Sequence, residues 1–197
     1  MTFLRVSALA AITTWVLAGV APLVGASGSA AVAQTIAAPE RKPAQKSPNA
    51  RRPGGGPHVY LLRGLLNVFS LGMDDLAQKI QRRGINATVH NHAEWESLAN
   101  DIASQYKAGR HGSIVLIGHS LGADAVMFMG EYLGKRGVPI ALIVPFDGTG
   151  SFAATGNVAR VMNLTQRDYA YMRRGNGFRG ELQNIDVSKD TSIDHIT

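Results

Sequence analysis

Apolar and polar positions follow two different periods from residue 58 onward. Short apolar runs predict strands at 59–62, 85–89, 113–117, 139–145 and 158–164, and more weakly at 182–187. Apolar residues recurring every three or four positions predict helices at about 73–83, 94–108 and 121–133. Strands alternating with helices at this spacing indicate an α/β protein with an open, mostly parallel sheet and helices on both faces.

The run 113–117 leads directly into Gly118-His119-Ser120-Leu121-Gly122 and then into the apolar helix 121–133. A serine on such a tight strand-to-helix turn exposes its hydroxyl at the edge of the sheet, and glycines flank it because larger side chains collide there. This G-x-S-x-G pattern is typical of a nucleophile elbow. It predicts Ser120 as the nucleophile of a hydrolase.

The first 33 residues have the pattern of a secretory signal. A single Arg5 precedes an apolar stretch from Val6 to Val24, and Ala31-Val32-Ala33 is a small-x-small cleavage sequence. The stretch is also nearly as long as the roughly 20 residues that span a bilayer, so an uncleaved N-terminal anchor is the alternative. Both interpretations place the rest of the chain outside the cytosol, in the periplasm or secreted.

Residues 34–57 combine five prolines with lysines, arginines and Gly54-Gly55-Gly56, without apolar periodicity. This composition predicts a disordered linker before a hydrolase domain at 58–197. The basic side chains either keep the disordered linker solvated by water or contact anionic lipid headgroups or cell-wall polymer.

The charge distribution and composition exclude several functions. The net charge is +6, but six of the 20 basic residues and only one of the 14 acidic residues precede residue 58, which leaves +1 for the domain. We therefore expect no nucleic-acid partner. The absence of cysteine excludes disulfides, thiolate metal sites and a cysteine nucleophile. Without a His-x-x-x-His or phosphate-cradling pattern, we expect neither a metal nor a cofactor.

A serine nucleophile needs a histidine to take its proton and a carboxylate to orient that histidine. In a sheet of this kind these residues follow the order serine, acid, histidine. Five of the six histidines precede or adjoin Ser120, and only His195 follows the last predicted strand. His195 is therefore the predicted base.

Four aspartates on predicted loops are candidates for the acid, namely Asp147, Asp168, Asp186 and Asp190. Asp147 is preferred because it directly follows the buried strand 139–145, where an ionised group needs a partner, and because a glycine loop leaves room for one. Asp168 and Asp190 remain open.

The oxyanion donors are expected from backbone N–H groups of Leu121 and of either Leu65 or Leu66. Arg63 either meets an anionic part of the substrate or forms an ordinary salt bridge. Asp124 is expected to complement the positive end of the following helix.

Together the segments 59–64, 118–123, 146–147 and 194–195 resemble the α/β-hydrolase superfamily, in particular its small lipase-like and thioesterase-like members. The resemblance implies a serine esterase or thioesterase. No insertion between Asp147 and His195 is long enough for an elaborate lid, so we expect an open site. An acid at Asp147 is similar to the thioesterase arrangement, whereas many esterases place it one strand later, near Asp168. Export favours carboxylic esters, lipid esters or acylated envelope glycans over thioesters. The alternative function is a non-catalytic hydrolase-like module that binds an envelope partner.

Overall fold

The computed structural model describes residues 56–65 and 71–190. The predicted signal segment, nearly all of the linker, Leu66 and His195 lie outside these residues. The described elements are β1 (His58–Arg63), α2 (Leu71–Gln81), β2 (Asn86–Asn91), η2 (His92–Glu94), α3 (Trp95–Lys107), β3 (Ile114–His119), α4 (Leu121–Gly134), β4 (Leu142–Phe146), β5 (Ala153–Ala154), β6 (Arg160–Thr165), η3 (Asp168–Ala170), β7 (Arg173–Arg174) and β8 (Glu181–Asp186).

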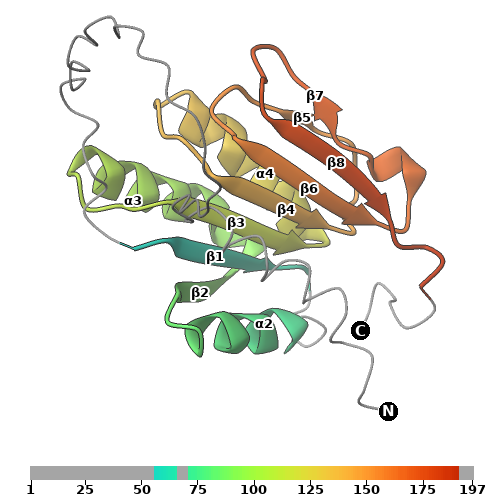
Figure 1. Ribbon diagram of the computed structural model, residues 1–197, viewed down its shortest axis with the longest axis horizontal. Coiled ribbons are helices and arrows are strands. Elements are labelled where there is room, and N and C mark those ends of the chain that lie inside the picture. Colours follow the sequence, from blue (N-terminus) through green and yellow to red (C-terminus); the bar gives the residue numbers. More distant parts are fainter. Residues whose placement is uncertain (1–55, 66–70, 191–197) are drawn as a thin grey trace, which may run out of the picture. The chain divides into compact units, whose positions relative to one another are not determined.

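Six of these strands form one parallel sheet in the order β2-β1-β3-β4-β6-β8 (Figure 1). Every neighbouring pair in it is parallel. β3 is buried along its whole length, as expected for a strand covered on both faces. The predicted α/β fold with an open parallel sheet is confirmed.

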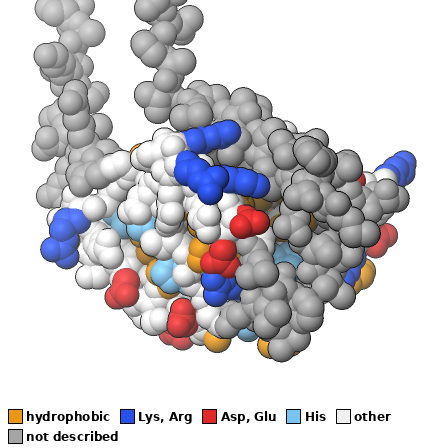
Figure 2. All heavy atoms as spheres, turned by 90° about the horizontal axis from the view of Figure 1, so that it is seen from below, with side chains coloured by type: hydrophobic (Ala, Val, Ile, Leu, Met, Phe, Trp, Pro, Cys, Tyr) orange, Lys and Arg blue, Asp and Glu red, His pale blue; other side chains and the backbone are white. Residues whose placement is uncertain are grey.

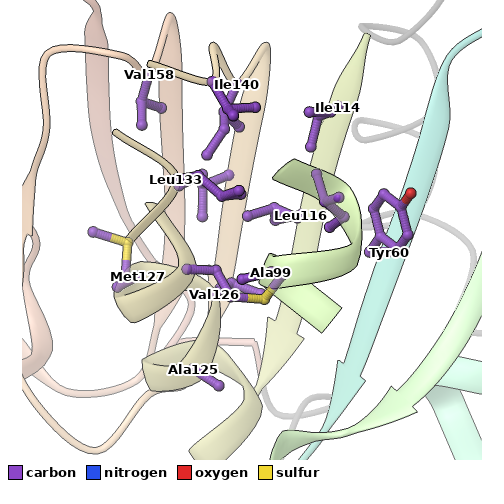
Figure 3. Packing of buried hydrophobic residues seen from close by; sticks show 14 of the residues in the cluster. Tyr60, Ala99, Ile114, Leu116, Ala125, Val126, Met127, Leu133, Ile140 and Val158 are labelled. Carbon is purple, nitrogen blue, oxygen red and sulfur yellow. The ribbon is translucent and has the colours of Figure 1, made fainter. Parts of the chain in front are cut away.

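Helices cover both faces of the sheet. Tyr60 and Leu62 of β1 belong to a buried cluster with residues of α3 and α4, and Figure 3 shows Leu116 and Leu133 in the same cluster. The alternate β1 residues point to the opposite face. Helix α2 packs against β1 and β2 and contributes no residue to that cluster, so it lies on the opposite face.

Helix α4 is the central helix of the described residues. It contacts β1, β3 and β4, and Val126, Met129 and Leu133 are completely buried. A helix that is apolar on nearly all sides belongs in a core. None of the helices in the described part of the chain is long and apolar enough to cross a membrane.

The connections after β4, where the sequence predicted loops, contain short strands. β5 and β7 pair in parallel as a separate two-stranded sheet. Their segments bring Ala154, Met172 and Phe178 into the main core. Three glycines lie between residues 147 and 158, and because glycine disfavours a helix, this crossover is extended.

Three histidines surround Tyr60 near the amino-terminal end of β1. His58 stacks on the Tyr60 ring with centroids 4.1 Å apart, and the Tyr60 hydroxyl is hydrogen-bonded to Nε2 of His111 at 2.6 Å. Thr88 Oγ1 lies 3.3 Å from His58 Nε2 and 2.8 Å from His90 Nε2. Histidine side chains also reach the surface on the face shown in Figure 2, among both basic and acidic side chains.

Burial lowers the pKa of each histidine in this cluster. Desolvation, followed by the charges of His111 and His90, lowers the pKa of His58 to about 4. Desolvation also lowers the pKa of His90, against the opposing charge of Glu94, and that of His111, against a hydrogen bond to the Gly112 carbonyl. These three rings are therefore neutral in the fold at pH 7.

Acidification from pH 7 to pH 5 is expected to lower the free energy of unfolding. Unfolded histidines take up protons near pH 6.5, whereas His58 stays neutral down to about pH 4. Between these values the unfolded chain binds more protons, so stability is present above pH 6.5 and is lost as the pH falls. After allowance for the partial exposure of the ring, His58 accounts for about 1 kcal/mol at pH 5.

Urea unfolding at pH 7, 6 and 5 measures this dependence. His58→Gln removes one of the titrating rings and is expected to be less sensitive to pH than the wild type. Equal pH dependence of the two proteins would contradict the assignment.

Candidate active site

Ser120 lies at the turn between β3 and α4 with φ 55° and ψ −123°. Its N–H donates to the Phe146 carbonyl at 3.0 Å, and its own carbonyl accepts from the N–H groups of Ala123 at 2.8 Å and Asp124 at 3.3 Å. The chain therefore reverses within one residue, from the last residue of a strand to the first of a helix. This is the local geometry that the G-x-S-x-G pattern predicts.

The two flanking glycines are required by close backbone contacts. A Cβ on Gly118 would lie 2.0 Å from the Gly122 carbonyl oxygen, and a Cβ on Gly122 would lie 2.2 Å from the Leu62 carbonyl oxygen. Backbone atoms cannot yield as a flexible side chain can, so no larger residue fits at either position. The elbow thus depends on β1 as well as on β3 and α4.

The loop after β1 runs beside Ser120. A Cβ on Gly64 would lie 2.9 Å from Ser120 Cβ and 3.4 Å from Ser120 Oγ. Leu65 follows with 62% of its surface exposed, so the expected oxyanion donor Leu65 is next to a residue that contacts the serine. The other proposed donor of this loop, Leu66, lies outside the described residues. Leu121 begins α4 directly after Ser120.

Arg63 precedes this loop and forms an ion pair and hydrogen bond with Asp74 of α2. Of the two roles expected for Arg63, the salt bridge is present. This pair ties the end of β1 to the helix that covers it.

Asp147 lies at the neighbouring strand end. His119 of β3 pairs with Phe146 of β4. Ser120 follows the first residue of this pair and Asp147 follows the second, so both lie at the same edge of the sheet. Asp147 has φ 47°, and among the described residues other than glycine only Ser120 and Asp147 have positive φ. Backbone strain of this kind concentrates at functional sites.

The Asp147 carboxylate is 1% exposed and is held by the loop after β6. Oδ1 accepts from Thr165 Oγ1 at 3.4 Å and from the Gln166 N–H at 3.3 Å. Arg167 Nη2 lies 3.9 Å from Oδ2. These donors offset the desolvation of a buried carboxylate.

The competing aspartates lie in different surroundings. Asp168 is exposed at the start of η3, and Asp186 and Asp190 are exposed at or beyond the end of β8. Hydrogen bonds from Ser188 hold the pKa of the Asp186 carboxyl below its usual value. Of the four sequence candidates, only Asp147 is buried beside the elbow.

Sequence reasoning missed Thr165, the last residue of β6, and Gln166 and Arg167, which follow it. Their signal was present, because they stand at the end of a buried strand as Asp147 does. Their approach to Asp147 depends on β6 lying next to β4, which periodicity does not reveal. The predicted base His195 lies outside the described residues. Within those residues no group of three or more histidine, aspartate or glutamate side chains is placed to hold a metal ion.

Comparison with solved structures finds a protein from Xanthomonas campestris pv. campestris whose description assigns it provisionally to the hydrolases of the alpha/beta superfamily. The match covers 67% of this chain and 87% of that chain, with 14% sequence identity and a TM-score of 0.41. No protein-family model and no curated protein matches this chain.

Proposed function

We propose that this protein is an exported serine hydrolase that cleaves carboxylic ester or thioester bonds through Ser120, Asp147 and His195. The observation that carries the proposal is the pair of strained residues at adjacent strand ends, Ser120 with φ 55° and Asp147 with φ 47°. A serine with a positive φ between a strand and a helix presents its hydroxyl away from the sheet. A buried carboxylate one strand away supplies the charge that orients a histidine.

In the proposed reaction Ser120 Oγ attacks the ester carbonyl while His195 takes the hydroxyl proton. The N–H of Leu121 and that of Leu65 or Leu66 donate to the oxyanion, and the N-terminal end of α4 adds its positive dipole. His195 then gives the proton to the leaving alcohol or thiol. Water, deprotonated by His195, releases the acid from the acyl-enzyme and regenerates Ser120.

Several features favour ester substrates of modest size. The connection after β4 holds only the short strand β5, and the connection after β6 holds η3 and β7, so neither of these two loops forms a large helical lid. Leu65 and Tyr169, each more than 60% exposed, follow strands that end at the elbow side of the sheet. We propose a small-molecule or lipid ester as substrate.

Ser120→Ala is expected to lower kcat by about a millionfold, because the nucleophile is removed while the fold is kept. The assay is hydrolysis of p-nitrophenyl esters of increasing chain length, together with labelling by a fluorophosphonate probe. Ser104→Ala on the exposed surface of α3 is the matched control and should keep both activity and labelling. Full activity of Ser120→Ala would overturn the proposal. Absence of labelling and activity in the wild type would favour the envelope-binding module instead.

Asp147→Asn is expected to lower kcat by about 10,000-fold, because a neutral amide no longer stabilises the protonated histidine. Asp168→Asn and Asp190→Asn, which change exposed carboxyls in the same way, should stay close to the wild type. The measurement is kcat for all three variants on the best ester substrate. A large loss in Asp168→Asn with an active Asp147→Asn would move the acid to the loop after β6.

Export is expected to remove residues 1–33, leaving Gln34 as the first residue. Expression of the full chain in a bacterial host, followed by fractionation and mass spectrometry of the N-terminus, measures this directly. Protein that keeps Arg5 and sediments with membranes would favour the anchored form. Protein that keeps Arg5 and stays in the cytosol would contradict both forms.

A further inference from the structure

Asp124 lies in the first turn of α4 and is buried, with 6% of its surface exposed. Its carboxylate lies at the positive end of the helix and also accepts hydrogen bonds from another segment. Oδ1 accepts from the Thr149 N–H at 3.0 Å, and Oδ2 accepts from the Thr149 hydroxyl. Both oxygens are therefore bound to one residue of the loop that follows β4.

This contact links the two strained residues of the site. Thr149 lies two residues after Asp147, and Asp124 lies four residues after Ser120. The Asp124 N–H donates to the Ser120 carbonyl at 3.3 Å. Asp124 thus holds the nucleophile turn through its backbone and the acid loop through its side chain.

Packing at Gly148 shows how closely the loop lies against the helix. A Cβ on Gly148 would lie 2.9 Å from Asp124 Oδ1 and 3.3 Å from Ala123 Cβ. The backbone after Asp147 therefore rests directly on the first turn of α4. On the other side, Thr165 and the Gln166 N–H hold the Asp147 carboxylate.

We propose that Asp124 is a positioning residue that sets the place of Asp147 relative to Ser120, an inference that rests on the proposed serine hydrolase function. The Thr149 N–H and the Thr149 hydroxyl both donate to the Asp124 side chain, one to each oxygen. A carboxylate accepts both bonds, whereas an alanine at this position accepts neither. The carboxylate thus serves the loop as well as the helix dipole.

The test uses Asp124→Ala and Thr149→Val in the full chain. Asp124→Ala removes both acceptors, and Thr149→Val removes the hydroxyl donor while nearly preserving side-chain volume. We expect kcat to fall about tenfold or more with KM within about twofold, since the acid shifts but the pocket does not. The histidine pKa seen in the pH dependence of kcat/KM should also fall, because a displaced carboxylate stabilises the imidazolium less.

Two further variants separate positioning from general stability. Thr149→Ser keeps both donors and should retain wild-type kcat. Thr155→Val removes another threonine hydroxyl, one that donates to Asn157, and should leave kcat and the pH profile unchanged. The double variant Asp124→Ala with Thr149→Val should lose no more than Asp124→Ala alone, because both changes break the same contact.

Wild-type kcat and pH profile in both single variants would overturn the positioning role. A kcat loss matched by an equal loss of folded protein, with an unchanged pH profile, would reduce Asp124 to a structural residue and also overturn it. If Ser120→Ala keeps full activity, the hydrolase proposal fails and this inference fails with it. If Ser120→Ala is inactive and only the Asp124 result is negative, the hydrolase proposal stands alone.

Discussion

The contact on which the site depends is the approach of Gly122 to the backbone of β1, where a Cβ would lie 2.2 Å from the Leu62 carbonyl oxygen. This close approach lets α4 start directly over the sheet. Ser120, in the turn between β3 and α4, then has a positive φ. Such a conformation costs a non-glycine residue about 1–3 kcal/mol. The fully buried side chains Val126 and Leu133 of α4 offset it, since each stabilises the fold by about 1.5–3 kcal/mol. The core thus holds the elbow in a strained shape.

The second strained residue is held by a different set of forces. Asp147 follows β4, and its N–H donates to the Leu164 carbonyl at 2.7 Å, so its backbone is fixed by the next strand. Its carboxylate is nearly inaccessible and is hydrogen-bonded by Thr165 and Gln166. A buried charge is tolerated only with such donors. Ser120 is therefore positioned by packing, and Asp147 by polar contacts between the ends of β4 and β6.

This difference explains how much of the molecule could be predicted from the sequence. The strand and helix periods predicted the α/β sheet, and the glycines around Ser120 predicted the elbow, because both signals are local. β5 and β7 have two residues each and are too short to show a period. The bond between Asp124 and Thr149 joins residues 25 positions apart, so the helix dipole was the only role that the sequence indicated for Asp124. Likewise, the Arg63–Asp74 pair requires knowledge of where α2 packs.

Within the described residues, His58 and the elbow lie at opposite ends of β1. His58 begins β1 and Gly64 follows its end six residues later, so His58 lies about 20 Å along the strand from the elbow at 3.3 Å per residue. Protonation of His58 acts at the start of β1, where it pairs with β2. Under the proposed function, protonation of the base would stop catalysis without unfolding. Acid inactivation would then have two separable causes. Loss of the base would be immediate and reversed on raising the pH, whereas loss of the sheet edge would follow the rate of unfolding.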